Sequence, residues 1–516
     1  MTPTRRDVLK FMLTGSVAAS CPFDLSLLDA ADEPRQLVDG EHFDVCHKVR
    51  DGVQFSRPSV SGRYDVIIVG GGISGLAAAY FLDKYNFLLL EKEPHFGGNA
   101  YLEEYEAQAY ATGAAFDFKN SESEKLATEL GLKLLPIDNP DPTIVRGKWV
   151  PDTWRAGLDE LPYPRNVRDS FKKFKKDVLA MNALKEPEKY DAEPLSKYLA
   201  GYAPEIKKWW DSYGPSNWGA DADNTSFWIA MFDFKDMTQE PVNDTRATLP
   251  GGNGAISKRL HERLVANHRE HMLGAATAIG VEQQSQEITV TYMHSGKLQT
   301  VAAKAAIVAT PKFITSLLVA GLPPAQRDAM NAIRYAPYPV VNLIFDKRVY
   351  DRGYDTWCPG NSFTDFTPAD WVLRNRPLYH QEKEILTFYT PLDLADRHLL
   401  LTVEGCKSIA LSVLRDFRKL LPEFRDAEPA EVRLYRRGHP MFMSSPSVYT
   451  KILPAASRPL ERIFFANTDS IGPESLTYAA VQSARKGAEW AEKVLAGKSV
   501  GALANPEVEI VRQQNT

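Results

Sequence analysis

The sequence has few cysteines and lacks any long hydrophobic run. Its 516 residues include only four cysteines, Cys21, Cys46, Cys358 and Cys406, and no C-x-x-C pair. This spacing indicates neither a zinc knuckle nor a c-type haem attachment site. Cys358 and Cys406 form either a disulfide or two thiols, depending on the redox compartment. No apolar segment approaches the about 18 residues that a membrane span needs, so we expect a soluble mature chain.

A strong charge of either sign is also missing. The net charge is −5 with 25% charged residues, and the isoelectric point is near 6.1. This balance gives no general attraction to nucleic acid, so we expect a small-molecule partner instead. The sequence shows no internal repeat, which excludes solenoid architectures. Its length leaves room for two substantial domains.

The N-terminus has the pattern of an export signal. Arg5 and Arg6 stand just before the apolar run 11–23, which is too short and too polar to span a bilayer. The pair matches the twin-arginine pattern, with Val8 where a phenylalanine is commoner. We therefore predict a twin-arginine signal over residues 1–31 that engages the Tat export machinery. Membrane contact is expected through this signal alone, and the mature protein is expected in the periplasm or cell envelope.

Two alternatives remain for the processing of this signal. Cleavage near Ala30-Ala31 would leave a free mature chain, whereas Cys21, which follows Ala18-Ala19-Ser20, would serve for lipid attachment. The large apolar residue that usually stands three positions before a lipoprotein cysteine is absent.

The strongest motif is D-V-I-I-V-G-G-G-I-S-G-L-A-A-A, which begins at Asp65. An apolar run at 66–69 predicts a buried strand, and the alanine-rich stretch after the glycines predicts a helix. Glycines in the pattern G-x-G-x-x-G permit a tight turn, a close approach of backbone to a diphosphate, and close helix–strand packing. The helix N-terminus then directs N–H groups at the phosphates. The predicted cofactor-binding residues here are Gly70, Gly72, Ile73, Ser74 and Gly75.

An acidic residue and a second glycine pair indicate FAD rather than NAD. Glu91 ends the next predicted strand, about 20 residues after the glycines, where a carboxylate binds ribose hydroxyls and repels a 2′-phosphate. A further G-G pair follows directly, which NAD dehydrogenases do not need, and a strand-and-glycine stretch comes at 110–116. The residues added to the predicted site are Glu91, Lys92, Gly97, Gly98, Asn99, Ala100 and Gly113.

Three distant segments extend the pattern. The loop 248–254 reads T-L-P-G-G-N-G, a buried strand ends in A-T-P at 309–311, and a C-terminal strand leads to Asp469. A helix is predicted over 477–495. We predict that Asp469 binds ribityl hydroxyls while the N-terminus of this helix, with Tyr478, faces the flavin pyrimidine.

Together these segments resemble the flavin-containing amine oxidase superfamily, which includes monoamine and polyamine oxidases and, more distantly, phytoene-desaturase-type enzymes. The resemblance covers roughly residues 64–497. It implies an α/β fold in which a Rossmann-type FAD-binding domain is interleaved with an α+β substrate domain. The expected ranges are a signal at 1–31, a lead-in at 32–63, an FAD domain at 64–120, 245–315 and 455–497, a substrate domain at 121–244 and 316–454, and a tail at 498–516.

The resemblance implies hydride transfer from the carbon next to an amine nitrogen to flavin N5, with oxygen, a quinone or a cytochrome as electron acceptor. The family places a lysine near N5 on the strand that corresponds to 338–345, and the position here is Asn342. An aromatic residue usually precedes the C-terminal helix, where this chain has Leu476, with Tyr478 nearby. Asn342 and Tyr478 are the candidate catalytic residues. The departures leave open a desaturase-type dehydrogenase for apolar substrates and a flavin-loaded electron-transfer protein.

Non-covalent FAD is expected, because the cysteine of covalent family members falls shortly before the last FAD strand and Cys406 lies well upstream of it. The stretch 46–52 looks like the lead-in of spermidine-dehydrogenase-like proteins, some of which carry haem. His47 would then be a haem ligand, the alternative being a structural histidine, since no partner motif accompanies it. No metal site is predicted.

Overall fold

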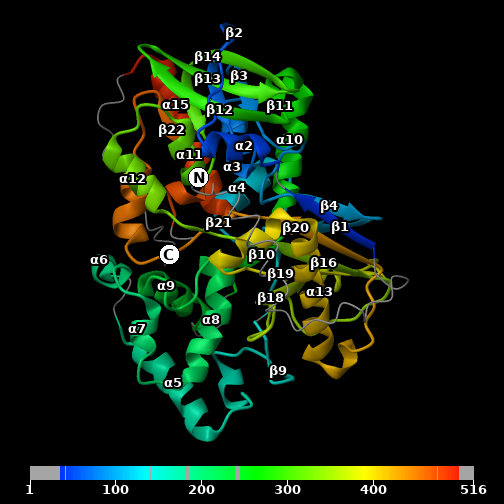
Figure 1. The fold of residues 1–516 in the computed structure, drawn as a ribbon. Helices are drawn as coiled ribbons and strands as arrows, with labels where there is room; N and C mark the ends of the chain where they lie inside the picture. The colour runs from blue at the N-terminus through cyan, green and yellow to red at the C-terminus, as the bar shows by residue number, and fades with distance from the viewer. Residues whose placement is uncertain are drawn as a thin grey trace, which may run out of the picture.

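The computed structural model describes the backbone at residues 35–40 and the residues 42–139, 141–181, 185–238, 244–472 and 475–498. Arg5, Arg6, Cys21 and the rest of the predicted signal lie outside the described residues, as does the tail from 499 onward. The fold is α/β, as predicted, with two large sheets and helices on both (Figure 1).

One large sheet gathers strands from distant parts of the chain. Its order is β11-β3-β2-β14-β13-β12, with β22 paired to β14. The strands β11, β3, β2, β14 and β22 run parallel, whereas β12, β13 and β14 form an antiparallel meander. The bounds are β2 Val60–Val69, β3 Phe87–Leu90, β11 Met272–Leu273, β12 Ala276–Gln284, β13 Glu287–His294, β14 Lys297–Val308 and β22 Ile463–Phe465. Strand β2 begins four residues before the predicted domain start at 64.

The core around this sheet follows the alternation of its side chains. Val66 and Ile68 face one apolar cluster, and Ile67 and Val69 face another, because successive strand residues point to opposite faces. The first cluster is completed by α3 (Ile73–Phe81), α10 (Gly254–His268) and α15 (Thr477–Leu495). Helix α4 (Glu122–Glu129) also packs against α15, so the cover of this sheet extends past the predicted boundary at 120.

The second large sheet has eight strands in the order β1-β20-β16-β19-β18-β17-β8-β9. Strand β1, from the predicted lead-in, pairs in parallel with β20. Helix α13 (Val403–Leu420) packs on this sheet. The strands are β1 Arg35–Gly40, β8 Thr143–Val145, β9 Lys148–Val150, β16 Val340–Phe345, β17 Thr356–Trp357, β18 Asp365–Pro368, β19 Glu384–Tyr389 and β20 Glu431–Arg436.

Short elements connect the two sheets. Three small sheets are formed by β6, β10 and β7, by β4 and β5, and by β15 and β21. The remaining bounds are α2 Asp44–Arg50, β4 Leu102–Tyr105, β5 Gln108–Ala111, β6 Asp117–Phe118, β7 Leu135–Pro136, β10 Arg246–Thr248, α11 Lys312–Leu318, α12 Pro324–Ala332, β15 Tyr335–Ala336, β21 Met441–Phe442 and α14 Leu453–Ala456.

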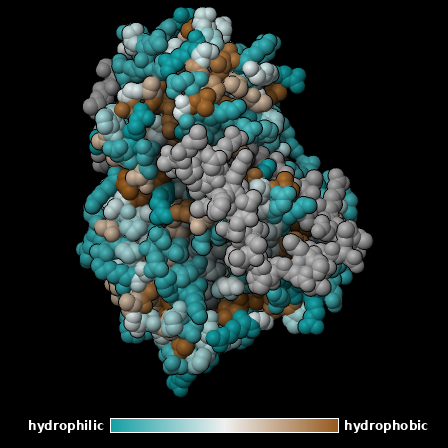
Figure 2. Space-filling view, in the orientation of Figure 1, coloured by the Kyte–Doolittle hydropathy of each residue, from teal (hydrophilic) through white to brown (hydrophobic). Residues whose placement is uncertain are grey.

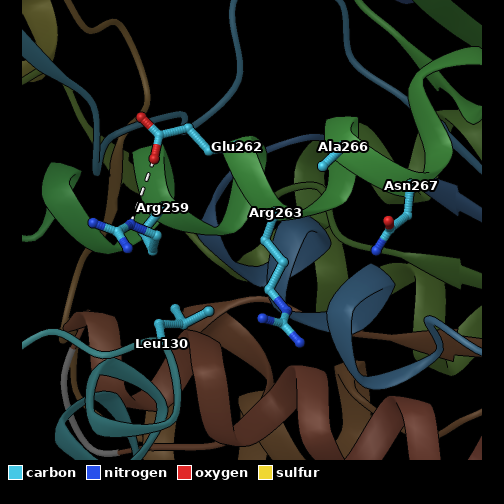
Figure 3. Close-up of a pocket in the computed structure, with 6 residues that line it drawn as sticks. All are labelled: Leu130, Arg259, Glu262, Arg263, Ala266 and Asn267. Carbon is cyan, nitrogen blue, oxygen red and sulfur yellow. Dashed lines mark ion pairs between the residues drawn. The ribbon is translucent and has the colours of Figure 1, made fainter.

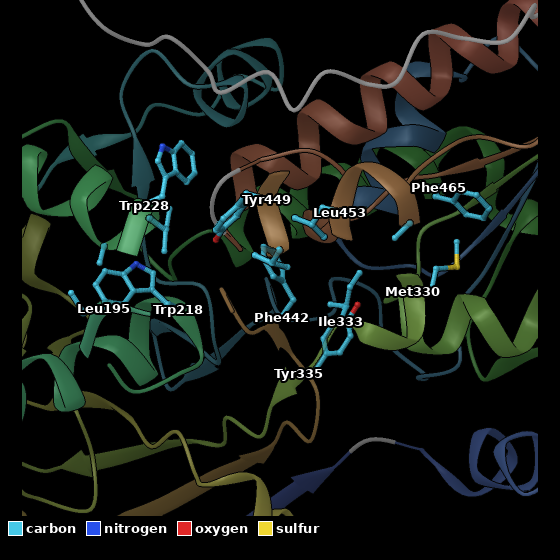
Figure 4. Close-up of a cluster of buried hydrophobic side chains, with 14 of the residues drawn as sticks. Leu195, Trp218, Trp228, Met330, Ile333, Tyr335, Phe442, Tyr449, Leu453 and Phe465 are labelled. Atoms are coloured by element: carbon cyan, nitrogen blue, oxygen red, sulfur yellow. The ribbon is translucent and has the colours of Figure 1, made fainter. Parts of the chain in front are cut away.

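A helical insertion lies below the sheets in Figure 1. It holds α5 Arg165–Leu179, α6 Pro187–Asp191, α7 Leu195–Leu199, α8 Pro204–Trp218 and α9 Phe227–Thr238. Its aromatic side chains join one continuous core with β15, β21, α12 and α14. Figure 4 shows this core from Trp218 and Trp228 through Phe442 to Tyr335 and Phe465. The insertion is therefore packed onto the body of the molecule.

The face in Figure 2 is mostly hydrophilic, with scattered hydrophobic residues. Among the described helices none has the length and apolar character to cross a membrane. Cys358 and Cys406 are free thiols, so the predicted alternative of a Cys358–Cys406 disulfide is not formed.

Candidate active site

The predicted glycine motif forms a tight cradle at the carboxyl end of β2. Gly70 has φ of +106°, and a Cβ there would lie 2.7 Å from the carbonyl oxygen of Ala309. A Cβ on Gly75 would lie 1.8 Å from the carbonyl oxygen of Gly70. Gly72 caps α3, and a Cβ on it would meet only the Cα of Gly98 within 4 Å. The cradle therefore excludes side chains at the turn and leaves the first turn of α3 open for a diphosphate.

The second glycine pair folds back onto the first. The amide of Gly97 donates to the carbonyl oxygen of Gly71 at 2.9 Å, and a Cβ on Gly98 would lie 3.1 Å from the Cα of Gly72. Asn99 then accepts from the amide of Ala114 at 3.1 Å. A Cβ on Gly113 would lie 2.4 Å from the carbonyl oxygen of Asn99.

The other predicted residues of this part lie in the same loops. The amide of Ala100 donates to Gly97 at 3.1 Å. The Ser74 hydroxyl donates to the carbonyl oxygen of Ala466, just beyond β22, at 3.0 Å. Ile73 is buried in the first turn of α3. The glycine loop, the second pair and the end of β22 thus meet at one edge of the sheet.

Glu91 is fixed by backbone at the end of β3. Its Oε2 accepts from the amide of Gly71 at 2.6 Å, and its Oε1 accepts from the amide of Glu93 at 2.8 Å. Burial raises the pKa of this carboxyl, although the neighbouring Lys92 opposes the shift. Each oxygen keeps a second lone pair, so the carboxylate suits the hydroxyls of a ribose.

Lys92 does not act alone, because its ammonium lies 2.5 Å from Oε1 of Glu93. Glu93 also accepts from the backbone amide of His42 at 2.6 Å and pairs with the His42 ring. The lead-in is thereby attached beside the predicted ribose site, a contact that sequence patterns did not predict.

Asp469 lies in a fully buried ion pair with Lys312. The Lys312 ammonium lies 2.7 Å from Oδ1 of Asp469, and both side chains are completely buried. The Lys312 amide donates to Oδ2 at 2.9 Å, and the Tyr335 hydroxyl donates to the same oxygen. Burial lowers the pKa of Lys312, against the pull of Asp469. Asp469 thus accepts from three donors within the protein, and its contact with ribityl hydroxyls stays a prediction.

Lys312 and Tyr335 were missed by the sequence analysis. Lys312 follows the A-T-P segment at the end of β14, and Tyr335 is on β15. Figure 4 shows Tyr335 beside Phe442 and Ile333, within the core that joins the two halves of the molecule. The pair with Asp469 therefore ties the ends of β14 and β22 to that core. The only sequence signal for this arrangement was that Pro311 and Asp469 each follow a predicted strand.

The segment 111–118 connects the two predicted catalytic residues. Asn342 on β16 is fully buried, and its Nδ2 donates to the carbonyl oxygen of Ala111 at 3.3 Å and to Thr387 Oγ1 at 2.8 Å. Tyr478, in the first turn of α15, has its ring 6.3 Å from that of Phe118. The two candidates thus lie at opposite ends of this segment and contact different parts of it.

Asn253, in the P-G-G-N-G loop, also holds the segment 111–118 in place. The fully buried Asn253 donates from Nδ2 to the carbonyl oxygen of Phe116 at 2.7 Å and to Thr477 Oγ1 at 2.9 Å. The motif was visible in the sequence, whereas its role in holding the start of α15 to Phe116 was not.

Tyrosines and carboxyls from the eight-stranded sheet form the wall opposite this segment. The Tyr389 hydroxyl donates to the carbonyl oxygen of Gly113 at 3.0 Å, and that of Tyr354 donates to Ala115 at 3.5 Å. Behind them lie the buried carboxyls Asp355 and Asp365. Burial raises the pKa of Asp365 to about 6. A small hollow of about 10 Å³, room for roughly one water molecule, lies between the segment and this wall. It is lined by Ala111, Ala115, Thr248, Leu249, Gly252, Tyr354, Thr367, Pro368, Ala369, Trp371, Val372 and Thr387.

A second groove lies elsewhere, along α10. Figure 3 shows it lined by Leu130, Arg259, Glu262, Arg263, Ala266 and Asn267, with Arg259 and Glu262 paired at 3.4 Å. None of the predicted site residues borders it. His47, the predicted haem ligand, is on α2 with its ring 4.8 Å from Phe43. The described residues contain no group of three or more His, Cys, Asp and Glu that could hold a metal ion.

The model of the flavin containing amine oxidoreductase family matches residues 73–490 of the chain. The chain belongs to this family. Solved structures agree on the fold. Cyclohexylamine oxidase from Brevibacterium oxydans superposes with a TM-score of 0.65 at 19% identity, covering 84% of this chain and 99% of that chain. Putrescine oxidase bound to putrescine gives a TM-score of 0.61 at 16% identity, covering 84% and 99%.

One relative of known name matches this chain over only part of its own length. Oxidoreductase PigB from Serratia sp. is 23% identical over 368 residues. The match covers 58% of this chain and 54% of PigB, so the chain spans about half the length of this relative.

Proposed function

We propose that the protein is an FAD-dependent oxidoreductase that oxidises an amine at the carbon next to nitrogen. The observation that carries the proposal is the glycine cradle with Glu91 at the carboxyl ends of β2 and β3. Family membership supports a flavin, and the backbone-fixed carboxylate supports the ribose of FAD. The names of the solved relatives, cyclohexylamine oxidase and putrescine oxidase, support an amine as substrate.

The residues of the cradle would hold the cofactor without a covalent bond. The open first turn of α3 offers N–H groups to the diphosphate, and Glu91 offers acceptors to the ribose. Cys358 and Cys406 are fully buried in the core beside the eight-stranded sheet. Burial raises the pKa of both thiols, which disfavours the thiolate that a covalent link needs. Bound flavin supplies the hydride acceptor.

The substrate side of the site would position a neutral amine and exclude water. Tyr354, Tyr389 and Tyr478 are buried, and the pKa values of Tyr354 and Tyr389 are raised by burial, so both phenols stay protonated. Asn342 carries no charge and cannot take a proton, so the amine must arrive neutral to use its lone pair. The chain contributes orientation and a dry wall rather than a base at this position.

The test is flavin reduction by a panel of amines under anaerobic conditions. Bleaching of the visible flavin band by an amine supports the proposal. Bleaching only by apolar alkenes would instead support the desaturase-type alternative, and no bleaching by either class would support an electron carrier. Reoxidation by oxygen, a quinone or cytochrome c then identifies the electron acceptor.

We also propose export in the folded state through the Tat machinery. The support is the pair Arg5-Arg6 together with a cofactor site built from segments as distant as β2 and α15, which must close before export. Residues 1–31 fused to a folded reporter would test this. Changing both arginines to lysine should abolish export, whereas Lys10→Gln, which leaves the pair intact, should not. Equal export of both variants would contradict the proposal.

A further inference from the structure

Arg437 is a buried cation that forms no ion pair with any described residue. It follows β20 directly and is 8% exposed. Its Nε has no hydrogen-bond partner in the described part of the chain, and no carboxylate there forms an ion pair with it. Among the described residues, its guanidinium makes one hydrogen bond, from Nη2 to Thr112 Oγ1 at 3.4 Å. A buried charge with no ion pair and only one long hydrogen bond is strongly unfavourable.

The surroundings of Arg437 add positive charge rather than offsetting it. The Nε of Arg397 is also buried without a partner, while its Nη2 donates to the carbonyl oxygen of Tyr335. Two residues after Arg437, His439 has its ring 4.6 Å from Phe313. Burial, together with the charges of Arg397, His47 and Arg50, lowers the pKa of His439 to about 3. Arg50 has Asp51 as its partner, whereas the Nε atoms of Arg397 and Arg437 have none among the described residues.

This point adjoins the segments of the cradle. Thr112 immediately precedes Gly113, and the side-chain amide of Asn99 donates to the carbonyl oxygen of Pro440 at 2.9 Å, three residues after Arg437. The carbonyl oxygen of Arg437 accepts from the amide of Tyr338 at 2.8 Å, which holds the turn against the eight-stranded sheet. Arg437 therefore stands where the two sheets and the predicted flavin segments meet.

We propose that Arg437 is a binding residue for an anionic oxygen, and that this site is filled when the enzyme is loaded. A guanidinium presents a planar fork that suits phosphate or carboxylate oxygens. The anion would come either from the phosphates of the cofactor or from a carboxylate on the substrate. The inference rests on the proposed binding of FAD, but it does not depend on amine oxidation.

Two variants of Arg437 and one control separate the sources. Arg437→Gln removes the charge, and Arg437→Lys keeps it. Arg433→Gln is the control, because Arg433 lies on β20 too but is already paired with Glu431 and Glu103. The first measurement is the rate of FAD release from holoprotein in dilute urea, followed by flavin fluorescence. The second is the dissociation constant, from the perturbed flavin spectrum, for phenethylamine and for phenylalanine, which differ by one carboxylate.

If the cofactor supplies the anion, Arg437→Gln releases FAD about tenfold faster or more, and Arg437→Lys restores most of the retention. If the substrate supplies it, release is unchanged and the dissociation constant rises about tenfold for phenylalanine alone. The proposal is overturned if Arg437→Gln changes neither quantity, or if Arg433→Gln changes them equally. Failure of any amine to reduce the flavin would refute the proposed function while leaving the release measurement valid.

Discussion

The two walls of the candidate site treat their buried polar groups differently. On the side of the seven-stranded sheet, Glu91 accepts two backbone amides, and Asp469 accepts from Lys312 and Tyr335. On the side of the eight-stranded sheet, buried polar atoms of Asn342 and Arg437 have no partner among the described residues. The two carboxylates of the first wall thus have their partners, whereas Asn342 and Arg437 in the second each keep a buried polar atom without one among the described residues.

This difference assigns the walls different tasks. A buried group that already has its partners gives rigidity, because nothing is gained by moving it. A buried group without a partner costs free energy until something binds it. We therefore expect changes in the first wall to affect folding and cofactor retention, and changes in the second to affect ligand binding and pH dependence.

The largest effect is expected from Gly75→Ala. The new Cβ would lie 1.8 Å from the carbonyl oxygen of Gly70, which is backbone and cannot move aside without opening the turn. We expect purified protein without bound flavin, measured by the ratio of flavin to protein absorbance. Gly280→Ala on β12 is the control, since a Cβ there would meet nothing within 4 Å. A flavin content equal to that of the control would show that the cradle is not the cofactor site.

The next effect is expected from Lys312→Met. The change leaves Asp469 buried without its ammonium, and breaking a buried pair costs about 3–5 kcal/mol of unfolding free energy. Urea unfolding of the holoprotein followed by tryptophan fluorescence measures the loss. The double variant with Asp469→Asn should be more stable than Lys312→Met, because no unpaired charge remains.

Lys304→Met provides the comparison for this pair. Lys304 is on β14, the strand that leads to Lys312, and pairs with Asp65 at 2.8 Å, but its side chain is 62% exposed. Its loss should cost less than about 1 kcal/mol. Equal losses for Lys304→Met and Lys312→Met would mean that burial does not strengthen the inner pair.

A smaller effect is expected from Glu91→Gln. The amide keeps the size of the side chain but removes the charge and presents an NH₂ group to one of the two backbone amides. FAD affinity should fall about tenfold to a hundredfold, as for loss of hydrogen bonds to a charged group. Titration of apoprotein by flavin fluorescence measures it. Glu104→Gln is the control, because Glu104 is 52% exposed in its pair with Lys258.

The first wall could be predicted from sequence in part, and its limits have a physical cause. Gly70, Gly72 and Gly75 are spaced by local geometry, and α15 spans the predicted range 477–495. Lys312 pairs with a residue 157 positions away, so no local period marks it. The only sequence signal was that Lys312 and Asp469 each come soon after a predicted strand, which places both residues near the same edge of the sheet.

The second wall was even harder to predict from the sequence. A strand pattern predicted the position of Asn342, and the start of a helix predicted that of Tyr478. Neither pattern indicated that both residues contact the segment 111–118. Arg437 lies 325 positions from Thr112. Strand β1 pairs with β20, which ends one residue before Arg437, and this pairing of the lead-in has no sequence signature.

The smallest effect is expected at Asp365 and concerns pH. Its pKa is raised to about 6 by burial, against a usual value near 4. The folded chain therefore holds a proton between about pH 4 and pH 6 that the unfolded chain has lost, so stability falls as pH rises through this window. Asp365→Asn should remove this slope and raise the melting temperature at pH 8 by a few degrees.

Asp416 offers a control of opposite sign. Although burial opposes it, hydrogen bonds from Arg415 and Ser362 hold the pKa of Asp416 below its usual value. Its contribution to stability is present above about pH 4 and is lost as pH falls further. Asp416→Asn should therefore lower the melting temperature at pH 8, while Asp365→Asn raises it. The melting temperatures of both variants are measured by thermal unfolding from pH 4 to pH 8. A lower melting temperature at pH 8 for both variants would show that the charge of Asp365 does not destabilise the second wall.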